Sequence, residues 1–171
     1  MPTRIGGTRW LSHTLLAIEN LWKGYKGIVQ HLDQCWQQDT KLAPKANGMF
    51  KQLRSNSVVS YGHFMQDELS VLSIMSRELQ KKDASIYTCH AILETTKTSL
   101  KKLEERPGFH MEKLTNMSES FQGETLVGTF TYPTAIVSKL YEALENRYRD
   151  VSMNILGATK VAYLASWPID L

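Results

Sequence analysis

Apolar residues recur along the first part of the chain at alternating steps of four and three positions. They fall at Leu15, Ile18, Trp22, Tyr25, Val29, Leu32 and Trp36. This spacing puts them on one face of an α-helix and predicts a helix of about seven turns, with Ser12 as its N-cap. Gly24 and Gly27 lie inside the stretch, and each costs about 1 kcal/mol relative to alanine in a helix interior. The pattern therefore leaves open a kink or a split into two helices near them.

The next segments repeat this spacing. A break is predicted at 39–48. Pro44 in this break suits the first turn of a helix, and the pair Asn47-Gly48 suits a left-handed helix stop. A short helix around 49–53 is expected after the break. A second long helix is predicted from Val58, Tyr61, Met65, Leu69, Leu72, Met75 and Leu79. A third is predicted from Ile86, Cys89, Leu93, Thr96, Leu100 and Leu103, with Asp83 or Ser85 as N-cap and "ERPG" as its stop.

The last part of the chain is less regular. Residues 109–121 predict a shorter, weaker helix, and "GETLVGTFTY" at 123–132 is the one stretch with a strand-like composition. Because a lone strand has no partner, an ordered loop or a small edge hairpin is expected there. A final helix is predicted from Pro133 or Thr134, and the tail at 151–171 has a weaker pattern. The apolar positions of the final helix are Val137, Leu140, Tyr141, Leu144 and Tyr148.

Together these elements predict an all-α protein. The expected architecture is an irregular bundle of about five to seven helices forming a single helical domain over 1–171, with a short hairpin or ordered loop near 122–132. The chain has 171 residues, of which 42% are hydrophobic and 22% charged, which is typical of one globular domain. No apolar run approaches the roughly 20 residues of a membrane span, and no signal-peptide pattern opens the chain, so we expect an intracellular protein with no membrane partner.

The net charge of +3 is unevenly distributed. Residues 1–60 carry eight Lys or Arg against three acids, whereas residues 61–171 carry twelve against fourteen. Positive potential is therefore concentrated in the N-terminal third, and an anionic partner would meet that end first.

Few residue patterns point to chemistry. The chain has no Gly-rich phosphate loop and no G-x-S-x-G nucleophile turn. Cys35 and Cys89 lie far apart and are expected to be buried thiols; Cys35 could share a zinc ion with His31, but two further ligands are missing from the pattern. The acidic pairs Asp67–Glu68 and Glu104–Glu105 diverge on helices and are expected on solvated faces. We therefore predict no catalytic residue, metal site, cofactor or small-molecule substrate.

Trp10 allows two interpretations. A tryptophan at the start of a bundle helix is most often the first core residue. This one, however, adjoins Thr8 and Arg9 within the basic third. Stacking of a nucleobase on an exposed indole contributes about 1–3 kcal/mol to binding, and nearby cations bind the phosphate backbone of the nucleic acid.

Three segments resemble a known family. The segment "TRWLSHTLLAIENLWKGYKGIVQHL" resembles the start of the helical insertion domain of hAT-superfamily transposases, and above all of the vertebrate zinc-finger proteins domesticated from them. The stretch from Ser60 to Leu103 is similar to the next part of that insertion. "KLYEALENRYRD" and the later "WPID" are similar to its end, so the resemblance covers nearly the whole chain.

The resemblance implies a domain without its catalytic core. The family's RNase H-like fold holds its three carboxylates outside this insertion, so no residue here inherits a catalytic role and the chain is not expected to be an enzyme. The family implies that Trp10 stacks on a base flipped at the transposon end, and Arg9 would contact a neighbouring phosphate. Arg4, Lys23 and Lys26 complete the expected DNA-binding set, and a nuclear location is implied. The alternative is a helical protein-protein interaction or dimerisation module with no DNA binding.

Overall fold

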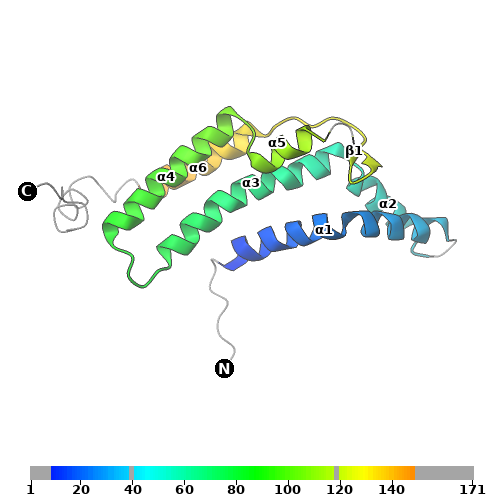
Figure 1. Ribbon diagram of the computed structural model, residues 1–171, viewed down its shortest axis with the longest axis horizontal. Helices are drawn as coiled ribbons and strands as arrows, with labels where there is room; N and C mark the ends of the chain where they lie inside the picture. Colours follow the sequence, from blue (N-terminus) through cyan, green and yellow to red (C-terminus); the bar gives the residue numbers. More distant parts are fainter. Residues whose placement is uncertain (1–8, 39–40, 118–119, 149–171) are drawn as a thin grey trace, which may run out of the picture. The chain divides into compact units, whose positions relative to one another are not determined.

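The structure is a computed structural model that describes residues 9–38, 41–117 and 120–148. The described residues form six helices and one two-stranded hairpin, which confirms the predicted all-α fold class (Figure 1). The helices are α1 (Arg9–Gln37), α2 (Ala43–Leu53), α3 (Asn56–Leu79), α4 (Ile86–Glu105), α5 (Phe109–Thr115) and α6 (Thr134–Tyr148). The strands are β1 (Ser120–Phe121) and β2 (Glu124–Thr125).

The chain divides into two compact units. Unit 1 comprises Met1–Ser70 and Pro107–Tyr132, and unit 2 comprises Val71–Arg106 and Pro133–Leu171. Helix α3 begins in unit 1 and ends in unit 2. The single domain over 1–171 stays a prediction.

Helix α1 is continuous through both of its internal glycines. It begins at Arg9, so Ser12 lies inside the helix and is not its N-cap, and the split considered near Gly24 and Gly27 does not occur. The reason is tertiary: Trp22, Tyr25 and Val29 are all buried, and their burial on one face outweighs the weak helix propensity of two glycines.

The core of unit 1 forms around the aromatic residues of α1. Trp22, Tyr25 and Val29 pack with Val59, Leu114 and Phe121 from α3, α5 and β1. The ring of Phe121 meets Trp22 and Tyr25 edge-on, with centroids 5.5 and 4.8 Å away, and the Tyr25 hydroxyl donates to the Leu53 carbonyl at 2.9 Å. The middle of the predicted apolar stripe is therefore core, whereas Trp36 at its end is 43% exposed.

Helix α2 lies against α1 and begins before the predicted short helix. Pro44 lies in its first turn as predicted, but Asn47 and Gly48 are helical, so the predicted left-handed stop is wrong. The buried Ala46 anchors this part of the chain in unit 1, and packing overrides the local turn preference.

The segment between α5 and α6 contains the predicted hairpin, shifted slightly toward the N-terminus. Strands β1 and β2 are antiparallel, and Gln122 and Gly123 connect them with φ of 51° and 89°, as a two-residue hairpin turn requires. Val127 then bridges Ser55 in parallel, and its N–H donates to the Arg54 carbonyl at 2.8 Å. Residues 120–127 thus combine a hairpin with an ordered loop, and the helix predicted over 109–121 ends at Thr115.

Helices α4 and α6 of unit 2 pack as an antiparallel pair. Ser85 caps α4 as predicted, since its hydroxyl accepts the Thr88 N–H at 3.1 Å. Three contacts join the helices, and their positions fall along α4 as they rise along α6. They are Glu104 with Ser138 (2.5 Å), Lys101 over the ring of Tyr141 (4.9 Å) and Lys97 with Glu145 (2.7 Å). The side chains buried in this pair are those of Leu93, Thr96, Leu100, Leu103 and Val137. The tail at 151–171, including "WPID", lies outside the described residues.

Candidate functional site

Trp10 lies in the first turn of α1 and is 58% exposed. The next residue, Leu11, is buried, so the helix begins to pack one position after the tryptophan. The interpretation of Trp10 as the first core residue therefore does not describe this structure. Arg9 is the first residue of α1, and Arg4 lies outside the described residues.

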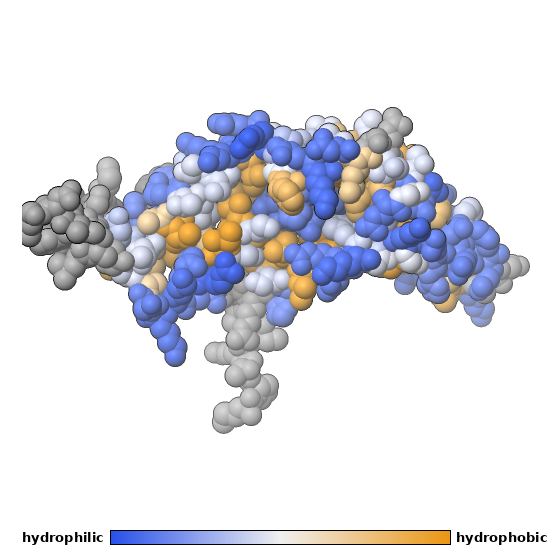
Figure 2. Space-filling model, viewed as in Figure 1, coloured by the Kyte–Doolittle hydropathy of each residue, from blue (hydrophilic) through white to orange (hydrophobic). Residues whose placement is uncertain are grey.

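Lys23 and Lys26 are both exposed on α1, less than one turn apart. At 1.5 Å per residue, Lys23 is roughly 20 Å along the helix axis from Trp10, and the two side chains point in different directions around it. Trp10, Lys23 and Lys26 are therefore spread along α1 and do not converge on one patch. Figure 2 shows mainly hydrophilic side chains over α2 and the end of α1 on the visible face.

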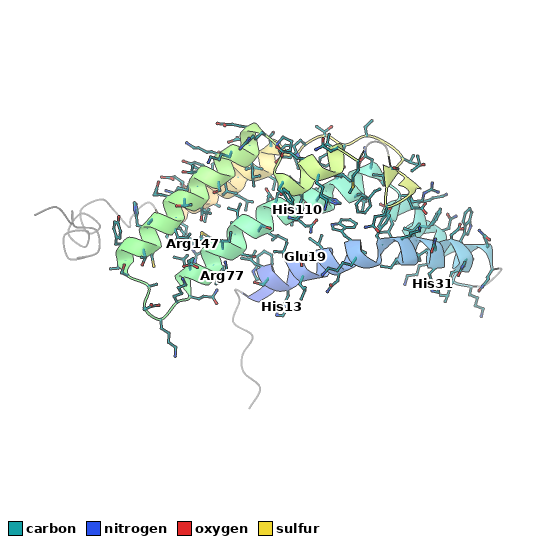
Figure 3. All side chains as sticks on the ribbon, viewed as in Figure 1. His13, Glu19, His31, Arg77, His110 and Arg147 are labelled. Carbon is teal, nitrogen blue, oxygen red and sulfur yellow. The ribbon has the colours of Figure 1, made fainter. Side chains whose placement is uncertain are left out.

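In the part of the chain that the structure describes, the histidines of α1 do not assemble a metal centre with other side chains. His13 and His31 lie on the side of α1 away from α5, opposite Glu19 (Figure 3). The Nε2 atom of His31 is 3.5 Å from the Cys35 Sγ, one turn along the helix. Among residues 9–38, 41–117 and 120–148 no three His, Cys, Asp or Glu side chains group closely enough to hold a metal ion. Both cysteines are free and only partly buried, so the prediction of buried thiols is wrong.

Asp67 and Glu68 correct the prediction that the acidic pairs lie on solvated faces. Asp67 is 6% and Glu68 3% exposed, whereas Glu104 and Glu105 are exposed as expected. The Asp67 carboxylate accepts the backbone N–H groups of His110 and Met111 at 2.9 and 3.1 Å. These groups open α5, whose N-cap, Gly108, has no side chain to offer. Asp67 thus supplies the cap from a position more than 40 residues earlier.

Glu68 has a different environment from its neighbour. Burial raises the pKa of Glu68 from 4.5 to about 7, and its Oε1 atom has no hydrogen-bond partner in the described part of the chain. Burial, together with the negative charges of Asp67 and Glu68, raises the pKa of Tyr132 to about 12. Among the carboxyl groups of unit 1 that the structure describes, Glu68 is therefore the one whose charge is most costly near neutral pH.

A pocket of about 250 Å³ opens in unit 1 among α1, α3, α5 and the hairpin. We call it the aromatic pocket. Buried side chains line its floor: Trp22, His63, Gln66, Leu114 and Phe121. Less buried side chains line its rim: Glu19, Lys23, His110, Lys113, Met117 and Gln122. Of Trp10, Lys23 and Lys26, the predicted DNA-binding residues whose side chains the structure describes, Lys23 alone reaches this pocket.

Two hydrogen bonds fix the floor of the aromatic pocket. Trp22 stacks on His63 with ring centroids 4.9 Å apart, and its Nε1–H donates to the Gln66 Oε1 at 2.8 Å. Burial lowers the pKa of His63, so the ring is neutral at pH 7. Its Nδ1 lies 2.8 Å from the Val59 carbonyl, which accepts the ring proton and fixes the tautomer.

The apolar spacing of α3 did not predict this floor. Tyr61, expected on the buried stripe, is 43% exposed, whereas His63 and Gln66 are 8% and 4% exposed. Trp22 of α1 stacks on His63 and donates to Gln66, so the cause of their burial is tertiary and leaves no signal in the periodicity of α3.

Comparison with known proteins leaves the chain without a family assignment, because no family model and no solved structure matches it. The resemblance to hAT transposases stays a prediction from the sequence. No helix among the described residues is both long and apolar enough to cross a membrane.

Proposed function

We propose that this chain is a non-catalytic helical domain related to the insertion domain of hAT transposases, and that it associates with DNA through its basic N-terminal third in the nucleus. The observation that carries the proposal is the exposure of Trp10 in the first turn of α1, in a segment with an excess of positive charge. An indole that is 58% exposed still has a face to offer a base.

Helix α1 supplies the two kinds of contact that such an interface needs. Trp10 offers an apolar surface that can stack only on an unpaired or flipped base, because paired bases already stack on their neighbours. Lys23 and Lys26 offer exposed ammonium groups, which interact with phosphates irrespective of sequence. They lie roughly 20 Å or more from Trp10 and face another side of α1, so a strand that contacts all three must cross the helix, with its end near the indole.

The non-catalytic part of the proposal rests on the resemblance, which covers the insertion and not the flanking segments that carry the family's carboxylates. The environment of Asp67 supports it, since both carboxylate oxygens accept backbone N–H groups of α5. A carboxylate used in this way is a poor ligand for a catalytic metal ion.

The experiment is a fluorescence anisotropy titration of the full chain with two labelled DNAs, a blunt duplex and the same duplex with unpaired bases at one end. Trp10→Ala should weaken binding to the unpaired end about 5- to 100-fold and leave the blunt duplex unchanged. Trp10→Phe is the matched control, because it retains an aromatic face. Equal loss on both DNAs, or a lowered melting temperature with unchanged DNA preference, would contradict the proposal.

The alternative function is a protein-protein interaction or dimerisation module. Leu16 and Ile28 favour it, being 50% and 37% exposed on α1. Sedimentation of the full chain tests this alternative: a dimer lost in Leu16→Asp, together with no DNA binding at low salt, would favour it over the DNA proposal.

A further inference from the structure

We propose that the aromatic pocket of unit 1 binds one nucleotide, with the base on its floor and the phosphate at its rim. The pocket lies apart from Trp10, so the inference goes beyond the proposed DNA association and does not depend on it. The ligand is a planar heterocycle that carries a phosphate, either as a free nucleotide or at the end of a strand.

Gln66 presents a hydrogen-bond donor to the pocket. An indole N–H can only donate, so the Gln66 side chain must turn its oxygen toward Trp22, which leaves its NH₂ group for another partner. Gln66 is 4% exposed, and in the described part of the chain no group accepts from that NH₂. The NH₂ nitrogen keeps some accessible surface, and Gln66 lines the aromatic pocket.

His63 presents an acceptor beside it. Its Nδ1 donates to the Val59 carbonyl, and the neutral ring therefore carries a lone pair on Nε2. This atom also has no partner in the described residues, although His63 is only 8% exposed and lines the same pocket. His63 and Gln66 are three positions apart on α3 and so lie side by side on one helix face.

A buried donor next to a buried acceptor selects a ligand with the reverse pair. Every standard nucleobase has an acceptor next to a donor on its Watson–Crick edge, and such an edge would satisfy both groups. Water can reach both groups through the pocket in the free protein, so a ligand that displaces it must replace both hydrogen bonds, which a ligand with only one of the two groups could not do. At about 250 Å³ the pocket is below the usual range of about 300–1,000 Å³ for drug-sized ligands, so it suits one small ring system.

The walls and rim fit the rest of a nucleotide. Trp22 and Phe121 give the floor an aromatic surface for a flat heterocycle. Lys23 and Lys113 extend from α1 and α5 at the rim, where Glu19 is the single acidic residue among the lining residues that the structure describes. Two ammonium groups against one carboxylate favour an anion at the entrance, and a phosphate provides it.

The experiment is isothermal titration calorimetry of the full chain with each nucleoside 5′-monophosphate, the matching nucleosides, inorganic phosphate, and a short oligonucleotide with a 5′-phosphate. At least one monophosphate should bind with a dissociation constant at or below about 1 mM, and more tightly than its nucleoside or phosphate alone. If only the oligonucleotide shows the effects of the variants below, the ligand is the end of a strand; if the monophosphate shows them too, a free nucleotide suffices.

Two variants test the two halves of the pocket. Lys113→Ala should weaken binding of the monophosphate roughly five-fold and leave binding of the nucleoside unchanged, because it removes a rim charge from an exposed position. Lys45→Ala on α2 is its matched control, an exposed lysine of unit 1 outside the pocket. His63→Phe keeps a ring against Trp22 but loses the hydrogen-bond acceptor, so it should weaken binding of the nucleoside and of the monophosphate alike. Circular dichroism checks that this variant is folded.

Three results would overturn the inference. The first is no heat of binding from any monophosphate at millimolar concentration. The second is binding that Lys113→Ala and folded His63→Phe leave unchanged. The third is equal or tighter binding of an acidic peptide that competes with the nucleotide, since the pocket would then recognise protein. These outcomes are independent of Trp10→Ala, so the failure of one proposal does not imply the failure of the other.

Discussion

The indole ring of Trp22 occupies the space where a Cβ atom on Gly62 would lie. Helices α1 and α3 can approach at this point because Gly62 has no side chain. Gly62→Ala should therefore lower the free energy of unfolding by about 1–3 kcal/mol, since Trp22 is held by His63 and Gln66 and cannot move aside freely. Urea denaturation measures the effect.

Gly27→Ala is the matched control for this prediction. It also replaces a glycine in a helix interior, but no atom lies within 4 Å of the added Cβ. It should raise the free energy of unfolding by about 0.5–1 kcal/mol, because alanine loses less backbone freedom on folding. Opposite signs for the two variants are expected, and a stabilising Gly62→Ala would show that Trp22 does not pack as described.

Asp67 caps α5 through space, so its removal should loosen that helix in particular. Asp67→Ala leaves two backbone N–H groups of α5 without their acceptor and should cost about 1–3 kcal/mol of stability. Hydrogen exchange followed by NMR should speed up at the amides of His110 and Met111. Glu112→Ala, which removes an exposed acid from the same helix, is the control, and equal exchange in both variants would contradict the cap.

The pKa of Glu68, raised from 4.5 to about 7 in the folded state, predicts a pH dependence of stability. The raised value means that the folded state prefers the protonated acid. Its contribution is fully present below pH 4.5 and is lost as the pH rises through about 7. Glu68→Gln should keep the protonated shape without the charge, and so stabilise the protein by at most about 3 kcal/mol at pH 8.

Thermal melting from pH 4 to pH 8 tests this expectation. The difference in stability between Glu68→Gln and the native chain should grow with pH over that range. Glu105→Gln, at an exposed position on α4, should change little at any pH. A constant difference between Glu68→Gln and the native chain would mean that Glu68 has the same pKa in the folded and the unfolded state.

Local signals in the sequence predicted some elements well. In α4 the Ser85 cap, the apolar spacing and the stop at 105–108 all act within a few residues, and the helix runs from Ile86 to Glu105 as expected. The continuous course of α1 through Gly24 and Gly27 was decided by packing instead, as was the helical state of Asn47-Gly48. Periodicity cannot weigh such contacts before the partners are known.

The buried polar groups of α3 were the least predictable part. Gln66 finds its partner Trp22 in α1, 44 positions away along the chain, and Asp67 finds its partners in α5, 43 and 44 positions away. A polar residue among apolar ones indicates a solvated face unless such a partner exists, so the sequence favoured exposure. The aromatic pocket, which needs residues from α1, α3, α5 and β1 together, could not be assembled from any local pattern.

The salt dependence of DNA binding tests the proposed function most directly. For the native chain, the logarithm of the binding constant should fall linearly with the logarithm of the salt concentration, because Lys23 and Lys26 displace counterions from phosphates. Lys23→Ala/Lys26→Ala should flatten that slope by about two units, and Lys82→Ala/Lys139→Ala, which removes two exposed lysines of unit 2, should not. Binding that is absent at low salt, or a slope equal in both double variants, would contradict DNA association through the N-terminal third.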